Sequence, residues 1–243
     1  MDRVVCNYMD GLISIIIPVY NHSEHLFEVL DALNKQTYTN IEVIVVDDGS
    51  VPPLESSHFS SFHFPLRFLR QENKGACAAR NFGFAHARGE YILFLDADVI
   101  ASPQMLQQLF EGLEKDTSAS YAYSDHYHGF KRFVARGFDG EALKKNNYIT
   151  TMSLIRRKDT VAWDESIRRF QDWDVWLTML EAGKHGVYVP GFLWRAYPHK
   201  GGMSDGLPSY AYKFPFRYLP WFFGRVRAYE KAKRIVMKKH GLI

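Results

Sequence analysis

The sequence lacks several features that would quickly assign it to a class of protein. Only two of its 243 residues are cysteines, Cys6 and Cys77, which is too few for a disulfide framework or a zinc motif. We interpret both as free thiols in a reducing compartment. No run approaches the roughly 18 consecutive apolar residues of a membrane-spanning helix. The first ten residues contain acids and no apolar core, so we expect no signal peptide.

Three signatures of other enzyme classes are also absent. The chain has no GxGxxG turn after a strand, no GxxxxGK[ST] loop and no GxSxG motif. These absences argue against a dinucleotide-dependent dehydrogenase, a P-loop nucleotidase and a hydrolase with a nucleophilic elbow. With 47% apolar and 23% charged residues, the composition is that of a folded globular protein.

Charge is distributed unevenly along the chain. The formal net charge is only +3. Residues 205–243 contain nine Lys or Arg and two acidic residues, a balance of +7, whereas residues 1–204 contain 21 basic and 25 acidic residues, a balance of −4. A basic tail of this kind indicates a negatively charged partner, such as phosphate, lipid headgroups or an acidic protein.

Strand-like and helix-like segments alternate over the first 125 residues. This alternation predicts an α/β fold with a mostly parallel central sheet flanked by helices. The expected strands are 12–20, 41–46, 66–70, 91–95 and 120–124, and the expected helices follow the first strand, cover 75–87 and begin near Ser102. The second half is less regular, with an expected mobile excursion over 130–145, a strand over 149–156, a helix from Phe170 and one or two strands over 186–194.

Two of the expected strands end in acidic pairs. Asp47-Asp48 precede Gly49, and Asp96 and Asp98 follow the strand at 91–95. Ligands of parallel α/β sheets bind at the carboxyl ends of the strands, so both pairs should face one crevice. Asp96 and Asp98 can share Mg²⁺ or Mn²⁺, or divide between the cation and a sugar hydroxyl. Asp47 can accept a base N–H, although each motif alone also fits an ordinary turn.

Three further side chains have two interpretations each. Tyr20 can stack on a nucleobase or pack as a rim aromatic. Arg80 can pair with Asp47 or reach the base, or lie on the surface of its helix. Asp172 stands at a helix start, where it can cap the helix or act as a general base. The helix dipole should keep Asp172 ionised and weaken it as a base.

The order and spacing of these segments are more specific than any one of them. The segments ISIIIPVYN, IEVIVVDDGS, NKGACAARNFGFAHARGEYILFLDAD and FQDWDVWLTMLEAG follow one another, and the combination strongly resembles family 2 glycosyltransferases. The resemblance covers about residues 12–204 and implies a glycosyltransferase A-type nucleotide-diphospho-sugar transferase fold. With no internal repeat or clear linker, we expect a single domain over 1–204. Its nucleotide-binding half is about 12–125, its acceptor-binding half is about 126–204, and a basic aromatic appendage occupies 205–243.

The resemblance implies roles for residues of the first half. The matches to the nucleotide-sugar site are Pro18, Val19, Tyr20, Asp47, Arg80, Asp96, Ala97 and Asp98. Among them, Val19, Tyr20 and Asp47 match the nucleobase pocket and Arg80 supports it. Asp98 of the DxD motif is the expected metal ligand, and Asp96 is expected nearer the ribose or sugar.

In the second half, the resemblance makes Asp172 the catalytic base. The family motif often reads Glu-Asp at this point, whereas this chain has Gln171-Asp172, which removes a neighbouring charge. His199 matches a histidine that some members bring to the metal or diphosphate, and Lys200 beside it is expected at the nucleotide sugar. Thr150, Thr151 and the group Trp163, Trp173 and Trp176 are available for the acceptor, although helical spacing favours a core position for Trp173 and Trp176.

The implied reaction is an inverting single displacement. A sugar passes from a nucleotide-diphosphate donor to an acceptor hydroxyl, with Mn²⁺ or Mg²⁺ as cofactor. The default donor is a UDP-sugar, and GDP- and dTDP-sugars stay open as alternatives. A glycan or lipid-linked sugar acceptor is expected, in cell-surface polysaccharide or glycolipid synthesis, with no nucleic acid partner. Two alternatives stay open: a non-catalytic sugar-nucleotide or glycan-binding module of the same fold, and a sugar-phosphate nucleotidyltransferase.

The tail also has two interpretations. Residues 210–243 are aromatic and basic, and Trp221, Phe222, Phe223, Arg225 and Arg227 can place the protein on an anionic membrane surface. Alternatively, the tail forms a helix packed on the domain with a solvated lysine face. We expect a cytoplasmic protein that, under the first interpretation, is peripheral at the inner face of the membrane.

Overall fold

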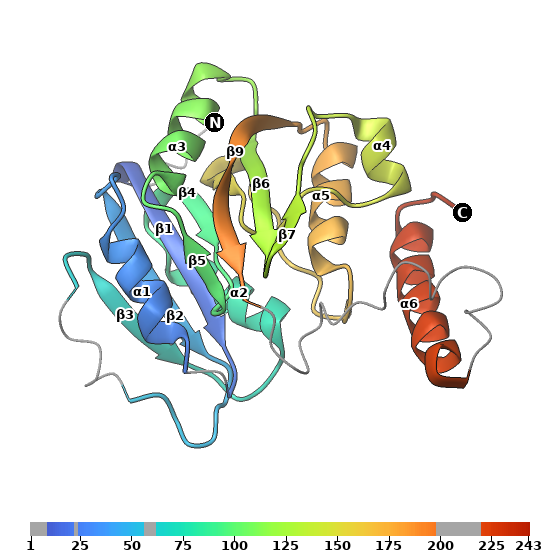
Figure 1. The fold of residues 1–243 in the computed structure, drawn as a ribbon, viewed down its shortest axis with the longest axis horizontal. Helices are drawn as coiled ribbons and strands as arrows, with labels where there is room; N and C mark the ends of the chain where they lie inside the picture. Colours follow the sequence, from blue (N-terminus) through green and yellow to red (C-terminus); the bar gives the residue numbers. More distant parts are fainter. Residues whose placement is uncertain (1–8, 22–23, 56–61, 198–219) are drawn as a thin grey trace, which may run out of the picture.

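A curled nine-stranded sheet forms the centre of the computed structural model, which describes residues 9–21, 24–55, 62–197 and 220–243 (Figure 1). In the last segment, side chains are described from Phe223 onward. The strand order is β3-β2-β1-β4-β8-β6-β9-β5, and β7 pairs with β6. The sheet is flanked by helices, so the predicted α/β fold class is confirmed.

The first half of the sheet is parallel, as the alternation of strands and helices predicted. Its strands are β1 (Met9–Val19), β2 (Ile41–Asp47), β3 (Leu66–Arg70) and β4 (Gly89–Phe94), joined by α1 (Leu26–Asn34) and α2 (Ala76–His86). β1 is central and is buried on both faces, because Ile15 and Ile16 are each fully buried on opposite sides. This burial explains why its sequence is a continuous apolar run and not an alternating one.

The second half of the sheet is mixed. It comprises β5 (Val99–Ala101), β6 (Tyr121–His128), β7 (Lys131–Phe133), β8 (Leu154–Arg156) and β9 (Gly186–Ala196). β8 is inserted antiparallel between β4 and β6, β5 and β7 are antiparallel edge strands, and β9 runs parallel to β6. The helices of this half are α3 (Met105–Lys115), α4 (Gly140–Lys145), the 3₁₀ turn η2 (Arg157–Asp159) and α5 (Gln171–Glu181).

Two apolar layers cover the faces of the sheet. The first layer joins α1 and α3 to one face through Leu30 and Leu109, and the second joins α2 and α5 to the other through Ala79 and Trp176. Small residues let α2 lie close to the sheet. A Cβ added to Gly83 would stand only 2.5 Å from Ile16 Cγ2, so this position has no room for a larger side chain.

The structure corrects one expectation about the second half and decides another. Residues 130–145 are not a mobile excursion, because they contain β7 and α4, and Asp139 caps α4 by accepting a hydrogen bond from the Ala142 N–H at 2.9 Å. Trp173 and Trp176 are 1% and 0% exposed, so the core position that helical spacing favoured is confirmed. Trp163 is 3% exposed and also belongs to the core, so none of the three is available to stack on an acceptor sugar.

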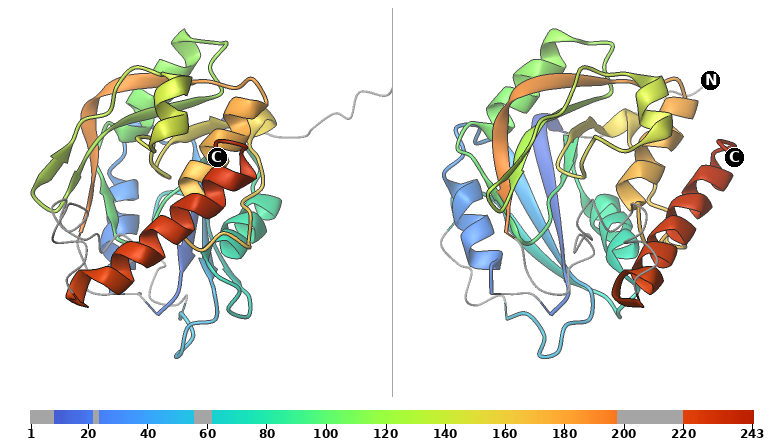
Figure 2. Two further views of the ribbon diagram at one scale, coloured as in Figure 1. Left: turned by 90° about the vertical axis from the view of Figure 1, so that its right-hand side faces the viewer. Right: turned by 45° about the vertical axis from the view of Figure 1, so that its right-hand side comes forward.

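The end of the chain forms α6 (Pro220–Lys239), which lies on the outer side of the molecule against α5 (Figure 2). Val236 of α6 is fully buried in the second apolar layer, and Lys239 bonds to Asp174 of α5. The described part of the tail is therefore a helix packed on the domain. Phe223, Arg225 and Arg227 are exposed in it, whereas residues 210–219 and the side chains of Trp221 and Phe222 lie outside the described residues. Among the described helices, none has both the length and the apolar character needed to span a bilayer.

Candidate active site

The DxD motif begins directly after β4, where Arg80 of α2 contacts it. The Arg80 guanidinium donates from Nη2 to Asp96 Oδ1 at 2.8 Å and from Nη1 to Gln171 Oε1 at 3.1 Å. It also stacks over the ring of Trp163 at 4.5 Å, and the residue is only 5% exposed. Arg80 therefore joins the end of β4 to the first residue of α5. Of the alternatives that the sequence left open for Arg80, pairing with Asp47 and a position on the surface of its helix are both wrong.

Asp47 pairs instead with Arg70, at the end of the neighbouring strand β3. Its Oδ1 accepts the Ser50 N–H at 2.8 Å, and its Oδ2 accepts the Leu54 N–H at 3.3 Å. Burial alone would raise the pKa of Asp47, but these hydrogen bonds and the Arg70 charge outweigh it and hold that pKa below its usual value. Asp47 is thus a fixed, ionised acceptor.

Asp48 shapes the same turn from the other side. Its carboxylate accepts the backbone N–H groups of Lys74 at 2.9 Å and Gly75 at 2.8 Å, and so ties the end of β2 to the start of α2. Gly49, which follows Asp48, has a φ of +82°, the positive angle that glycine at this point of the turn predicts. A hollow of about 500 Å³ lies beside this turn and is lined by Gly49, Arg70, Gln71, Glu72 and Asn73.

The end of β1 lies between the two acidic turns. Val19 stands opposite Asp47 in the parallel register, Pro18 stands opposite Val46, and the Val19 carbonyl accepts the Asp48 N–H at 2.8 Å. Tyr20 beyond it is 48% exposed. Because β1 separates β2 from β4, the two acidic turns are two strand spacings apart, or about 10 Å. They therefore share one edge of the sheet.

Asp172 enters this edge from α5. The helix begins at Gln171, and the residue before it, Phe170, has the left-handed backbone angles φ 62° and ψ 31°. Asp172 Oδ2 accepts a hydrogen bond from Asn147 Nδ2 at 2.8 Å, and Oδ1 accepts the Trp173 N–H at 2.9 Å. The residue as a whole is partly exposed, but its carboxylate is buried, and it lies close enough to Arg80 and Asp96 for their charges to affect its titration.

The pKa of Asp172 is raised to about 6, mainly because burial removes water from the carboxylate. The Trp173 N–H, the Arg80 charge and Asn147 lower the pKa, whereas the negative charge of Asp96 raises it. The expectation that the helix dipole makes Asp172 a weak base is therefore wrong, since desolvation outweighs it. At neutral pH the carboxylate is ionised and still has appreciable affinity for a proton.

The remaining predicted residues have different outcomes. Ala97 and Asp98 follow Asp96 and are partly exposed, and the Asp98 carbonyl accepts the Tyr197 N–H at 3.1 Å. The end of β9 therefore lies beside the DxD motif. His199 and Lys200 lie outside the described part of the chain.

The carboxylates of Asp96 and Asp98 fit a divalent cation that takes few of its ligands from the protein. Among the described residues, no three His, Cys, Asp or Glu side chains converge as they would in an all-protein metal cage. Mg²⁺ and Mn²⁺ in nucleotide sites usually take one or two carboxylates and complete their shell with substrate phosphates and water. Asp98 with Asp96 supplies hard oxygen ligands of that number at the strand end, so the donor set fits such an ion.

Two contributors to the site could not be read from the sequence. Asn147 holds the Asp172 carboxylate from a loop 25 residues away, and Arg70 neutralises Asp47 from 23 residues away. Neither has a local motif. The only available signal was that Arg70 ends an expected strand next to the one that ends in Asp47.

These features define a class of protein. A parallel half with acids at its strand ends, joined to a mixed half that presents a further acid on a helix, is typical of the glycosyltransferase A-type fold. The model of glycosyl transferase family 2 matches residues 14–161, and the chain belongs to that family.

Individual relatives agree with this assignment. The chain is 38% identical over 138 residues to glycosyltransferase GlyG of Streptococcus pneumoniae, a match covering 54% of this chain and 46% of GlyG. Its fold is similar to residues 1–349 of S. aureus TarS in complex with UDP-GlcNAc, with TM-score 0.66, 18% identity and coverage of 81% of this chain and 61% of that fragment. It is also similar to the mannosyltransferase PcManGT from Pyrobaculum calidifontis in complex with GDP-Man and Mn²⁺, with TM-score 0.61, 19% identity and coverage of 78% and 58%. The chain spans less than half the length of the first curated relatives that it matches.

Proposed function

We propose that the protein is an inverting glycosyltransferase that moves a sugar from a nucleotide-diphosphate donor to an acceptor hydroxyl. The observation that carries this proposal is that α2, the end of β4 and the start of α5 meet at one edge of the sheet. Arg80 connects Asp96 of the DxD motif to Gln171, directly before Asp172, whose pKa of about 6 suits a general base near neutral pH.

In the proposed reaction, each residue of this chain has a distinct role. Asp172 accepts the proton of the acceptor hydroxyl as its oxygen attacks the anomeric carbon, and the bond to the donor diphosphate breaks on the opposite face. Asn147 orients the Asp172 carboxylate by its hydrogen bond at 2.8 Å. Arg80 keeps Asp96 in place, where it can accept a hydrogen bond from the ribose or sugar. No covalent intermediate on the protein is needed.

Donor binding uses the other strand ends. We assign the nucleobase to the rim formed by Val19, Tyr20 and Asp47, where Asp47 is ionised and held rigidly by Arg70. Asp98 would hold Mn²⁺ or Mg²⁺, with His199 and Lys200 completing the diphosphate site. When bound, this cation would neutralise the growing charge of the leaving diphosphate.

The acceptor and location belong to the same proposal. A glycan or lipid-linked sugar in cell-surface polysaccharide or glycolipid synthesis is the proposed acceptor, and the proposed location is the cytoplasm, with peripheral contact between residues 210–243 and an anionic membrane. The relatives support the donor class, because TarS binds UDP-GlcNAc and PcManGT binds GDP-Man. UDP-sugars remain the default donor.

Calorimetric titration with UDP, GDP and dTDP, each with and without Mn²⁺, tests this proposal. We expect one of the three nucleotides to bind clearly more tightly than the others and to lose affinity when EDTA replaces Mn²⁺. The matching nucleotide sugar should then be hydrolysed slowly without acceptor and release a nucleoside diphosphate. Release of pyrophosphate from a nucleoside triphosphate would instead indicate a nucleotidyltransferase, and binding of none of the nucleotides would contradict the proposal.

A further inference from the structure

α6 lies outside the residues that match the family model, yet it contacts the turn that carries Asp172. Three residues that surround Asp172 in the sequence, Phe170, Trp173 and Asp174, all contact α6. Their contacts are of three kinds: an aromatic pair, a cation over a ring and an ion pair. The Asp172 carboxylate itself contacts Asn147, which is not part of α6.

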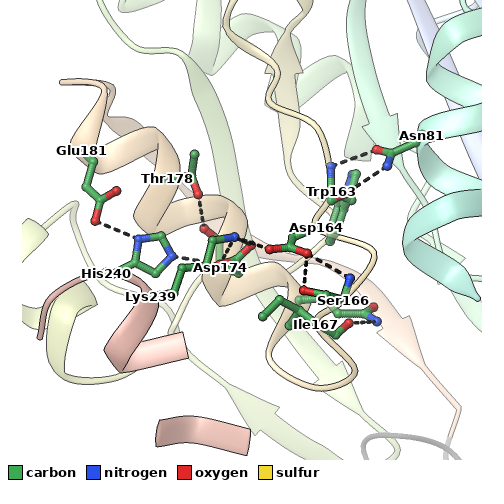
Figure 3. A network of polar contacts seen from close by, with 11 residues as sticks. Asn81, Trp163, Asp164, Ser166, Ile167, Asp174, Thr178, Glu181, Lys239 and His240 are labelled. Atoms are coloured by element: carbon green, nitrogen blue, oxygen red, sulfur yellow. Dashed lines mark hydrogen bonds and ion pairs between the residues drawn. The ribbon is translucent and has the colours of Figure 1, made fainter. Parts of the chain in front are cut away.

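The ion pair compensates a buried charge. Asp174 is 2% exposed, and its carboxylate accepts hydrogen bonds from Lys239 Nζ at 2.8 Å and His240 Nε2 at 2.9 Å. The other ring nitrogen of His240 lies 2.8 Å from Glu181 Oε1, at the far end of α5 (Figure 3). The described side-chain partners of the Asp174 carboxylate are thus Lys239, at the end of α6, and His240, directly after it. A buried carboxylate is strongly disfavoured without such partners.

Lys239 also connects α5 to the loop before it. Its Nζ donates to Asp164 Oδ2 at 2.7 Å as well as to Asp174 (Figure 3). The loop is anchored at Trp163, whose backbone N–H and C=O both bond to Asn81 of α2 at 2.9 Å. Since Asn81 follows Arg80, α6 is fixed to the same helix that holds Asp96.

The aromatic pair between Phe170 and Tyr229 supports a residue with a strained backbone. Phe170 adopts left-handed backbone angles, which are unfavourable for a bulky side chain and persist only where packing imposes them. Its ring packs edge-to-face against Tyr229 of α6, with ring centroids 4.9 Å apart. The Phe170 ring also lies 6.0 Å from the ring of Trp173, and Lys233 of α6 lies over that Trp173 ring at 5.4 Å. α6 thus supports the backbone that turns the chain into Gln171 and Asp172.

We infer that Tyr229, Lys239 and His240 are positioning residues: α6 holds the first turn of α5 so that Asp172 faces the donor site. This inference rests on the proposed function of Asp172. It predicts that loosening α6 lowers the rate of donor turnover without weakening donor binding, because Tyr229, Lys239 and His240 contact α5 and the loop at Asp164, whereas the proposed nucleobase site is at the ends of β1 and β2.

The test compares Tyr229→Ala and Lys239→Met with the matched control Ile235→Ala, in the full chain and well below each melting temperature. Ile235 is on the same helix and is 50% exposed. The readouts are hydrolysis of the fastest donor in a panel of UDP-, GDP- and dTDP-sugars, and calorimetric binding of the corresponding nucleoside diphosphate. We expect turnover to fall by about tenfold or more in both variants, with unchanged dissociation constants and no change in Ile235→Ala.

Two further measurements separate positioning from simple stabilisation. The acid limb of the turnover profile should move to lower pH in Tyr229→Ala, because a loosened turn lets water reach Asp172, which otherwise faces Arg80, Asp96 and Asn147. Lys239→Arg keeps the charge beside Asp174 and should restore turnover. If turnover and the pH profile of the folded variants equal those of the wild type, α6 only stabilises the fold and the inference is wrong. If the wild type turns over no donor, the proposed function fails first.

Discussion

Replacement of Asp172 by asparagine is expected to reduce donor turnover by about a thousandfold, since general-base catalysis contributes about 10²–10⁴-fold. Asparagine has nearly the same shape, and its single amide oxygen can keep one of the two hydrogen bonds that Asp172 accepts, from Asn147 or from the Trp173 N–H, but it cannot take a proton from the attacking hydroxyl. The dissociation constant of the nucleoside diphosphate should not change. Steady-state turnover and calorimetry on the same preparations measure both quantities.

The same variant should not lose stability at neutral pH. The folded-state pKa of Asp172, about 6, lies above the ordinary value of 3.8, so the ionised carboxylate is less favourable in the folded protein than in the unfolded chain. Asparagine removes that cost at pH 7, and the difference should disappear as the pH falls below the ordinary value. Asp31→Asn, a partly exposed acid on α1 paired with Lys35, is the matched control. Wild-type turnover in Asp172→Asn would favour a base elsewhere or a binding module.

Replacement of Arg80 by methionine is expected to impair both stability and turnover. The Arg80 side chain is 6% exposed, and its partner Asp96 is 36% exposed. Removing one partner of a fully buried ion pair lowers the free energy of unfolding by about 3–5 kcal/mol. Because Asp96 is partly exposed, we expect Arg80→Met to lower it by about 2 kcal/mol. Turnover should fall by about a hundredfold, because the end of β4 and the start of α5 lose their common partner.

The pH dependence distinguishes this effect from general damage. Arg80 lowers the pKa of Asp172 and Asp96 raises it, so loss of Arg80 should move that pKa further above 6. The acid limb of the turnover profile should therefore shift to higher pH, and turnover should recover partly as the pH is raised above 7. Arg234→Met, which removes an exposed arginine on α6, should leave both stability and profile unchanged. An acid limb that stays in place would show that Arg80 does not act on Asp172.

The sequence was informative wherever local pattern and burial coincide. The parallel strands β1 to β4, the helix α2 and the start of α5 were predictable because each combines an apolar run or stripe with a turn or cap signal. The order of the acidic motifs also allowed the strand-end site to be predicted, and the structure brings Arg80, Asp96 and Asp172 together.

The features that the sequence did not predict depend on contacts between distant segments of the chain. β5 and β7 have only three residues each, too few for a periodic signal, and the antiparallel insertion of β8 beside β4 is a property of chain topology. The partners of Asp47 and Asp172 come from other elements, so Arg70 and Asn147 were missed. The same reason explains the wrong expectation about Asp172, since the helix dipole is visible in the sequence and desolvation by packing is not.

The pH dependence of kcat/KM for donor hydrolysis, in wild type and without acceptor, tests the role of Asp172 most directly, because kcat/KM reports the pKa values of the free enzyme. If Asp172 is the desolvated base, kcat/KM should fall about tenfold per pH unit below a midpoint near 6, because the protonated carboxyl cannot take the proton of the attacking hydroxyl. A midpoint near the ordinary value of an aspartate, or a kcat/KM that does not depend on pH in this range, would contradict the assignment of Asp172 as the base.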